Sequence, residues 1–302
     1  MLSPRYHLVS IVAIFLALGL GLLAGSSFGQ PTLVGQLQER TEAQLRRIEE
    51  LRDEVDVERA RADALAAYAN ASAPILLAGR LAGSRVVVVT QEGVPSELET
   101  SVLEALDVAG ARVLVTLAAQ PSLTGADPTD AVALGALLGP SGADGATPWP
   151  TRAGALLAQR FAAPLAPIDA AGDLLVGLLD GGFLAARDGS LDDETRSEIH
   201  AAGFLVVVLG GTDADAPPLA TRPFVEALVA GLADAGVPVG AAETSAAGDP
   251  WVGDVPTDTA ITVVGAEAPP GAVALVLGLL DAAAPGEGGA YGGDRAPLPT
   301  IP

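Results

Sequence analysis

One short string in this sequence contains residue types that could bind a ligand. Gly210-Gly211-Thr212-Asp213-Ala214-Asp215 follows an apolar run, at the place where α/β sheets commonly bind ligands. The carboxylates of Asp213 and Asp215 could hold a divalent cation or a ligand hydroxyl beside the two glycines. The competing and more ordinary interpretation is a turn that ends a strand.

Other candidate motifs lack the context that their chemistry needs. Gly25-Ser26-Ser27-Phe28-Gly29 matches G-x-S-x-G, but a nucleophile elbow requires a preceding strand and a histidine within reach. His200 has no second histidine near it, since the other is His7. The acidic stretch before it in the chain predicts a solvated helix start and consists of Asp188, Asp192, Asp193 and Glu194. We therefore predict a protein that is not an enzyme and that has no resident cofactor.

Composition excludes several classes of protein. The chain has 302 residues, with 16 arginines, no lysine, 37 acidic residues and a net charge of −21. Without cysteine it cannot form disulfides, zinc knuckles or a thiolate nucleophile. An acidic chain lacks the cationic surface that nucleic acid requires. Most of the charge lies in residues 72–302, which have 28 acidic residues against nine arginines.

The N-terminus is typical of a membrane anchor. Residues 8–28 contain no charge, and 21 helical residues span a hydrocarbon core of about 30 Å. A cleaved signal peptide, with Ala24-Gly25-Ser26 as its processing site, is the alternative. An uncleaved anchor is favoured because the run exceeds a signal h-region and a helix-forming segment follows it. Arg5 places the N-terminus in the cytoplasm by the positive-inside rule, and the rest of the chain outside it.

Residues 29–72 predict a charged helix with one apolar stripe. With Val34 as an a position, the apolar a/d series continues for five heptads, or about 60 Å, which favours a loosely paired coiled coil. The alternative is a long amphipathic helix that lies on its own domain. The proposed seam consists of Val34, Leu37, Ile48, Leu51, Val55 and Leu65.

Small residues within the anchor suggest a second surface for self-association. Gly21, Gly25 and Gly29 are spaced four apart, and such a face lets membrane helices approach closely. The coil register, extended backwards, puts Leu20 and Leu23 on the seam instead. Both faces could be used if the helix breaks near residues 29–31.

The body, residues 73–284, predicts a three-layer α/β domain with a mainly parallel sheet. The β-branched run at 85–90, a helix at 95–109 and a second run at 112–116 form a βαβ unit. Further strands are expected at 204–209, 237–242 and 261–264, and further helices at 129–138, 151–161, 171–184, 223–235 and 271–283. Residues 285–302 are Gly- and Pro-rich and are expected to form a flexible tail.

The order of these parts resembles a known family. The chain resembles the actinobacterial MctB-like "copper transporter" family at both of its ends and at the start of the body. The similar stretches are Ser3-Pro4-Arg5-Tyr6-His7, the anchor end at residues 19–26, the Leu81-to-Val89 opening of the body, and the C-terminal stretches at 271–277, 289–292 and 298–299. The resemblance covers essentially the whole chain.

The resemblance implies an envelope location and a role in copper efflux or homeostasis, and it alone implies copper. A corynebacterial branch is associated instead with cell separation and with control of cell-wall hydrolases. Soft copper sites need Cys, Met or His, and this chain has Met1 and two histidines. We therefore keep three hypotheses. The first is a copper-export component, and the second is a coiled-coil dimeric scaffold that couples the envelope to a protein partner. The third is an enzyme or small-ligand binder that uses the loops of the sheet.

Overall fold

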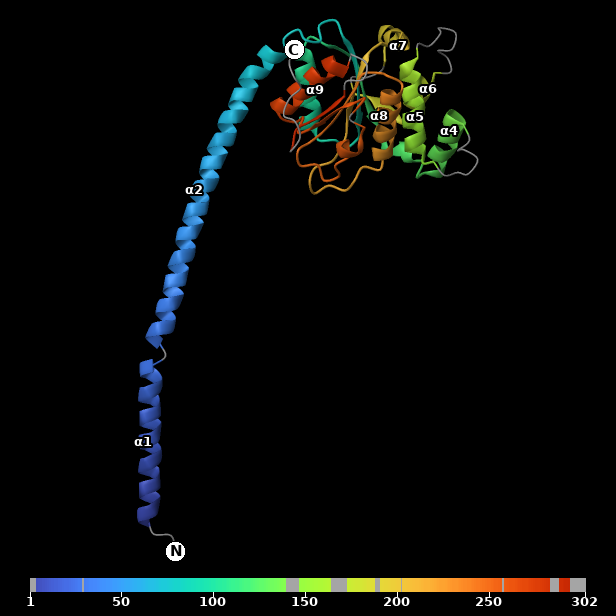
Figure 1. Ribbon diagram of the computed structural model, residues 1–302. Coiled ribbons are helices and arrows are strands. Elements are labelled where there is room, and N and C mark those ends of the chain that lie inside the picture. The colour runs from blue at the N-terminus through green and yellow to red at the C-terminus, as the bar shows by residue number, and fades with distance from the viewer. Residues whose placement is uncertain are drawn as a thin grey trace. The chain divides into compact units, whose positions relative to one another are not determined.

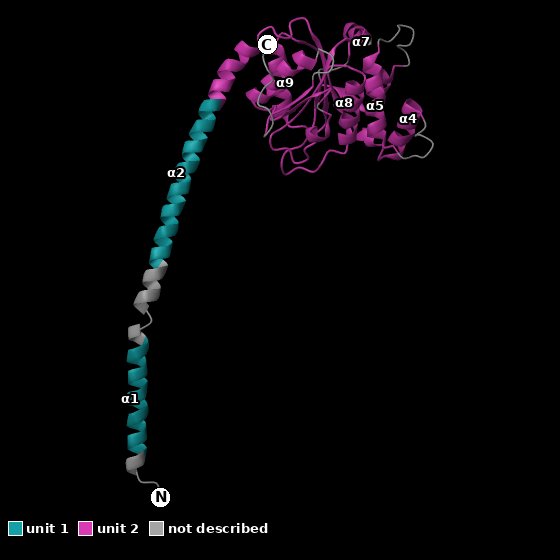
Figure 2. Ribbon diagram, in the orientation of Figure 1, with its two compact units in different colours: residues 1–65 teal, residues 66–302 magenta. Residues whose placement is uncertain are grey.

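The computed structural model describes residues 4–28, 30–139, 147–163, 173–187, 191–201, 203–256, 258–282 and 288–293. The chain divides into two compact units, residues 1–65 and 66–302 (Figures 1 and 2). Each unit is described by itself.

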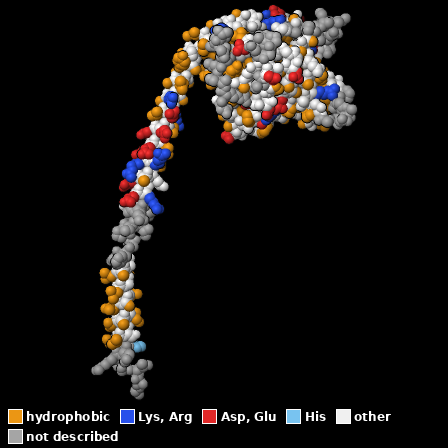
Figure 3. Space-filling view, viewed as in Figure 1, with side chains coloured by type: hydrophobic (Ala, Val, Ile, Leu, Met, Phe, Trp, Pro, Cys, Tyr) orange, Lys and Arg blue, Asp and Glu red, His pale blue; other side chains and the backbone are white. Residues whose placement is uncertain are grey.

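Unit 1 contains α1 and the first part of α2. α1 (Pro4–Phe28) contains a 19-residue span, His7–Gly25, with a mean hydropathy of 2.6, which is long and apolar enough to cross a membrane. α2 (Gln30–Leu77) begins in this unit and is 48 residues long, so the predicted long helix is confirmed. The apolar side chains of α1 and the mixed charges of α2 are evident in Figure 3.

Unit 2 is built around a seven-stranded sheet in the order β3-β2-β1-β4-β5-β6-β7, in which β3 alone is antiparallel to its neighbour. The strands are β1 (Arg85–Gln91), β2 (Arg112–Ala119), β3 (Leu184–Ala186), β4 (Leu205–Leu209), β5 (Val239–Glu243), β6 (Ile261–Val264) and β7 (Gly289–Tyr291). The α-helices are α3 (Ser96–Val108), α4 (Pro128–Leu138), α5 (Trp149–Ala162), α6 (Leu174–Asp180), α7 (Asp193–His200), α8 (Arg222–Asp234) and α9 (Pro269–Ala282), with short 3₁₀ turns at η1 (Pro121–Thr124) and η3 (Val252–Asp254).

Helices cover both faces of the sheet and form the predicted three layers (Figure 1). Alternate residues of the central strands point to opposite faces, so Val87 and Val89 of β1 pack with α4, α5, α6 and α8, whereas Val86 and Val88 pack with α3, α9 and the end of α2. All four valines are fully buried. A strand that is apolar on both faces requires this arrangement.

The last turns of α2 belong to the second of these two cores. Leu77, the last residue of α2, and Leu81, in the turn that follows, are 1% and 2% exposed and pack in the cluster that contains α3 and α9. The second unit accordingly starts at Ala66, seven residues before the predicted boundary at residue 73. The expected coil segment, 29–72, thus includes a stretch that is part of the body.

Two strands were not foreseen. β3 and β7 have three residues each, too few for a periodic pattern. β7 pairs with β6, which corrects the expectation of a flexible tail for residues 289–291; residues 294–302 lie outside the described part. The helix expected at 171–184 is shorter, since α6 begins after its N-cap Asp173, and Gly181 and Gly182 end it before β3.

A buried ion pair joins α5 to the start of α6. Arg160 Nε lies 2.6 Å from Asp173 Oδ1 and Nη2 lies 3.0 Å from Oδ2, and the side chains are 6% and 0% exposed. Asp173 also accepts the N–H of Leu175. Removal of one buried partner leaves the other charge without compensation.

We predict that Asp173→Ala lowers the free energy of unfolding by about 3–5 kcal/mol. Denaturant unfolding of the full chain in detergent, followed by fluorescence of the two tryptophans, measures this loss. Asp193→Ala is the matched control: Asp193 is fully exposed in its 3.7 Å pair with Arg196, and the change should be below about 0.5 kcal/mol. Equal losses in the two variants would contradict the role assigned to the buried pair.

Candidate functional site

The sheet has a topological switch point between β1 and β4. From β1 the chain crosses through α3, on one face, to β2; from β4 it crosses through α8, on the other face, to β5. The connections diverge there, and ligands of open α/β sheets bind in the resulting crevice at the carboxyl ends of the strands. The candidate ligand-binding string of the sequence analysis, residues 210–215, follows β4 at this place.

In this chain side chains fill the crevice. Gln91, at the end of β1, donates from Nε2 to Thr221 Oγ1 at 2.8 Å, and both residues are buried. A Cβ atom on Gly210 would lie 2.6 Å from Trp251 Nε1 and 2.9 Å from Gln91 Oε1. Position 210 therefore accepts no larger residue, and the indole of Trp251 occupies the space beside it.

Glu243 holds the indole in place. It ends β5, is 2% exposed, and accepts the backbone N–H groups of Trp251 at 2.7 Å and Val252 at 3.2 Å through Oε2. The two bonds fix the loop that leads from β5 to η3. The carboxylate thus has a structural task in the described chain, as an acceptor for buried backbone donors.

The energies favour a closed crevice. Nε1 of Trp251 is buried without a hydrogen-bond partner among the described residues, which costs about 1–3 kcal/mol. Burial of a tryptophan removes about 150–250 Å² from water, worth about 4–6 kcal/mol at 25 cal/mol per Å². The burial outweighs the unmade bond. The geometry therefore gives little support to a small-ligand site at this edge.

The predicted acidic loop forms a turn. Asp213 and Asp215 are exposed, Ala216 donates its N–H to the carbonyl of Asp213 at 3.0 Å, and Gly211 has a φ of +93° that favours glycine. Among the described residues no group of three or more His, Cys, Asp or Glu is placed to hold a metal ion. The arrangement matches the turn interpretation.

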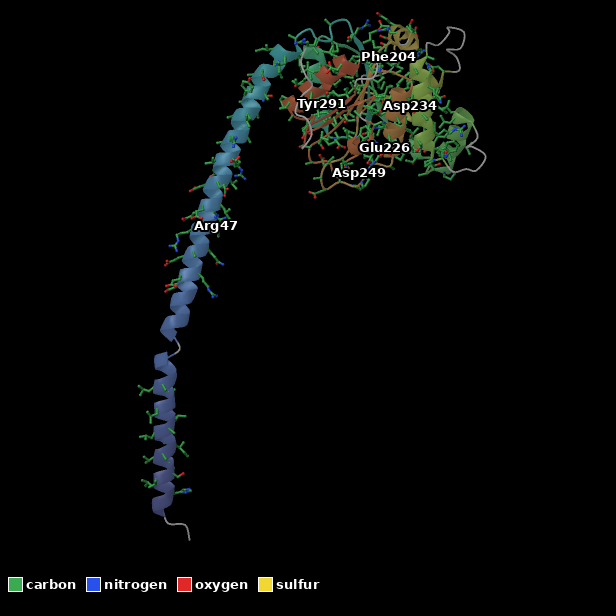
Figure 4. The ribbon with its side chains drawn as sticks, in the orientation of Figure 1. Arg47, Phe204, Glu226, Asp234, Asp249 and Tyr291 are labelled. Atoms are coloured by element: carbon green, nitrogen blue, oxygen red, sulfur yellow. The ribbon has the colours of Figure 1, made fainter. Side chains whose placement is uncertain are left out.

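A charged cluster near this edge was missed by the sequence analysis. Arg222 lies 2.6 Å from Glu226, 2.5 Å from Asp249 and 3.0 Å from Asp254, and Figure 4 labels two of these carboxylates. Burial lowers the pKa of Arg222, but hydrogen bonds and charge from Glu226 and Asp249 outweigh it and raise the pKa. The cluster ties the loop before η3 to α8. The sequence did not reveal the cluster because Asp249 and Asp254 lie 27 and 32 residues from Arg222 in the chain.

The remaining sequence candidates lie apart from this edge. The acidic stretch begins α7 as predicted: Asp192 is the N-cap, 2.7 Å from the N–H of Thr195, which lowers the pKa of its carboxyl. His200 ends α7, and His7 lies in α1. Gly25 to Phe28 are helical, so the G-x-S-x-G string does not form a nucleophile elbow. Asp188 and Gly29 lie outside the described residues.

The proposed seam of α2 is an exposed apolar stripe. Ile48, Leu51, Val55 and Leu65 are between 43% and 62% exposed, and the side chains of Val34 and Leu37 lie outside the described part. Beyond Leu65 the same register reaches Leu76, which packs on the body. The stripe available to a partner therefore ends near residue 65. On α1, Gly21 and Gly25 have no atoms near their Cβ positions.

A shallow groove runs along the end of α2. It has a volume of about 160 Å³ and is lined by Ala73 and Leu77 of α2, Ser101 and Val108 of α3, and Val273 of α9, among others. Binding sites for drug-sized ligands occupy about 300–1,000 Å³. The groove is thus too small for that class of ligand.

We predict that Glu243→Ala destabilises the chain by about 2–6 kcal/mol, because two buried N–H groups lose their acceptor at about 1–3 kcal/mol each. Acrylamide quenching should rise as Trp251 becomes exposed. Glu243→Gln keeps an acceptor oxygen and should lose less than half as much. The exposed Glu97→Ala should leave quenching unchanged. Unaltered quenching in Glu243→Ala would contradict the role of this carboxylate.

The comparisons with known proteins address the whole chain. No curated protein sequence matches it. The family model described as "Copper transport outer membrane protein, MctB" matches residues 1–299. The match includes the apolar helix, the charged helix and the α/β body, and it confirms the resemblance noted in the sequence. This chain belongs to the MctB family of copper-transport-related membrane proteins.

Proposed function

We propose that this chain is a non-enzymatic, membrane-anchored protein of the cell envelope that supports copper efflux without a copper site of its own. The observation that carries the proposal is the whole-chain family match, over residues 1–299, together with the apolar helix His7–Gly25. Copper is here a cargo of the system, and the chain contributes assembly.

The chemistry of the side chains supports an indirect role. Copper(I) prefers thiolate, thioether and imidazole ligands, and the chain offers no cysteine, Met1 and two histidines. His7 lies in α1 and His200 at the end of α7, in different units. A single helix cannot enclose a conducting path, so transport requires other subunits.

The proposed topology places α2 and the body outside the cytoplasm. Arg5 precedes the apolar span and favours a cytoplasmic N-terminus. The strongly acidic remainder, with 28 acidic residues against nine arginines after residue 71, is consistent with this orientation. α2 then extends from the membrane surface, where its stripe is accessible to other envelope proteins.

We expect deletion of the gene to raise cell copper and lower copper tolerance, with zinc tolerance as the control. The purified full chain, dialysed against copper(I) with a competing chelator, should retain no stoichiometric copper. Unchanged tolerance and copper content would remove the copper role. Tight one-to-one retention would instead contradict the absence of a site in the chain.

A second candidate function is a scaffold that couples the envelope to a partner in cell separation or cell-wall hydrolase control. The exposed stripe of α2 favours it, because an apolar stripe on a long charged helix is typical of a pairing helix. Self-association through this stripe and the glycines of α1 would give a loose dimer anchored in the membrane.

The cysteine-free sequence permits a clean test of pairing. We predict that the purified Leu51→Cys chain, reconstituted in lipid vesicles without other proteins, forms a disulfide-linked dimer under mild oxidation, because d positions face each other across a seam. Asp53→Cys, two residues away and on the opposite face, should remain monomeric. Equal dimer yield from the two variants would show that collisions, not the seam, bring the chains together.

A further inference from the structure

The charges beside the α2 stripe are sorted by sign. In the register of the seam, the e and g positions that flank it contain six charged residues, five of them arginine. The five arginines are Arg40, Arg47, Arg52, Arg59 and Arg61, and the sixth charged residue is Glu54. The helical segment as a whole is acidic, yet its flanks are basic, because seven acidic residues lie on the outer b, c and f positions. These seven are Glu39, Glu42, Glu49, Glu50, Asp53, Asp56 and Asp63.

The structure confirms the helical spacing on which this sorting depends, since α2 is continuous from Gln30 to Leu77. The flanking arginines are exposed: the side chains of Arg47, Arg59 and Arg61 are between 66% and 76% accessible, and Figure 4 shows Arg47 projecting from the helix. Their pairs within the helix, at 3.3 to 4.0 Å, are solvent-exposed and weak. A partner helix can therefore engage these arginines.

A second copy fits this stripe poorly. Two chains with the same membrane anchor must pair in parallel, where each g residue faces an e residue of the next heptad. Arg47 then faces Arg52 of the partner subunit, a repulsive pair. Glu58, at a d position, faces Glu58 of the partner subunit across the seam. One attractive pair, Glu54 with Arg59 of the partner subunit, opposes these two.

An unlike helix with the opposite flank charge satisfies every arginine. Acidic e and g residues would face all five, and a basic residue opposite Glu58 would remove the repulsion at the seam. We propose that the α2 stripe binds a helix of a different protein, apolar at its seam and acidic at its flanks, in preference to a second copy. This rests on the proposed role of the chain as an assembly component. The loose dimer is then the form that the partner helix displaces.

Synthetic peptides test the proposal against the full chain in nanodiscs. The acidic-flank peptide keeps residues 34–65 except for Glu at every e and g position and Lys at position 58. The matched control has the same composition, with seven of these Glu residues exchanged for the seven non-acidic residues at the outer b, c and f positions. Circular dichroism verifies equal helicity of the two peptides. Fluorescence anisotropy should show at least tenfold tighter binding of the acidic-flank peptide, weakening as salt rises.

Two further measurements make the outcome decisive. Replacement of Arg40, Arg47, Arg52, Arg59 and Arg61 by Glu should reverse the preference, so that an arginine-flanked peptide binds better. Equal affinity for the acidic-flank and control peptides would overturn the proposal. If the unmodified 34–65 peptide binds as tightly as the acidic-flank peptide, the occupant is a second copy and the proposal is also overturned. Neither result alters the copper phenotype of the deletion, which tests the proposed function separately.

Discussion

The central sheet depends on having both of its faces covered. Val86 to Val89 of β1 are fully buried, alternately toward the two cores, so a missing layer would expose a run of branched apolar side chains to water. On one face α5 and α8 supply the cover. On the other, α3 and α9 are joined by the last turns of α2, where Leu77 is 1% exposed. The helix that bears the charged stripe therefore ends in residues that belong to the core.

The same packing explains why the usual ligand position of such a sheet is closed. Gly210 lies so close to the indole of Trp251 and the amide of Gln91 that a single methyl group there would clash. Glu243 directs its carboxylate to the backbone of the loop that holds Trp251. Chemistry-bearing residue types are thus present at the switch point, yet their hydrogen bonds serve the fold. On α2, by contrast, apolar side chains are exposed and charges are sorted by position, and this is the surface that we propose for recognition.

Residue patterns predicted most of the elements because the signals are local. The β-branched runs marked β1 and β4, the 3.6-residue spacing marked α3 and α8, and Asp192 marked the start of α7. What the sequence could not provide depends on distant residues. β7 is a strand because β6 offers it a partner, Arg222 collects carboxylates up to 32 residues away, and Trp251 reaches β1 and β4 from the loop after β5. The heptad pattern continues through Leu76, which packs on the body, so periodicity alone does not reveal where the buried part of α2 begins.

The role that we propose for this chain is assembly at the membrane, in a system whose cargo is copper. The most direct test is complementation of a deletion strain with two variants. One has Ile48, Leu51 and Val55 replaced by Asp, which removes the stripe and leaves the body intact; the other has His7 and His200 replaced by Ala. With equal membrane levels and equal tryptophan fluorescence, we predict that the stripe variant fails to restore copper tolerance and the histidine variant restores it fully. Restoration by the stripe variant together with failure of the histidine variant would contradict the account.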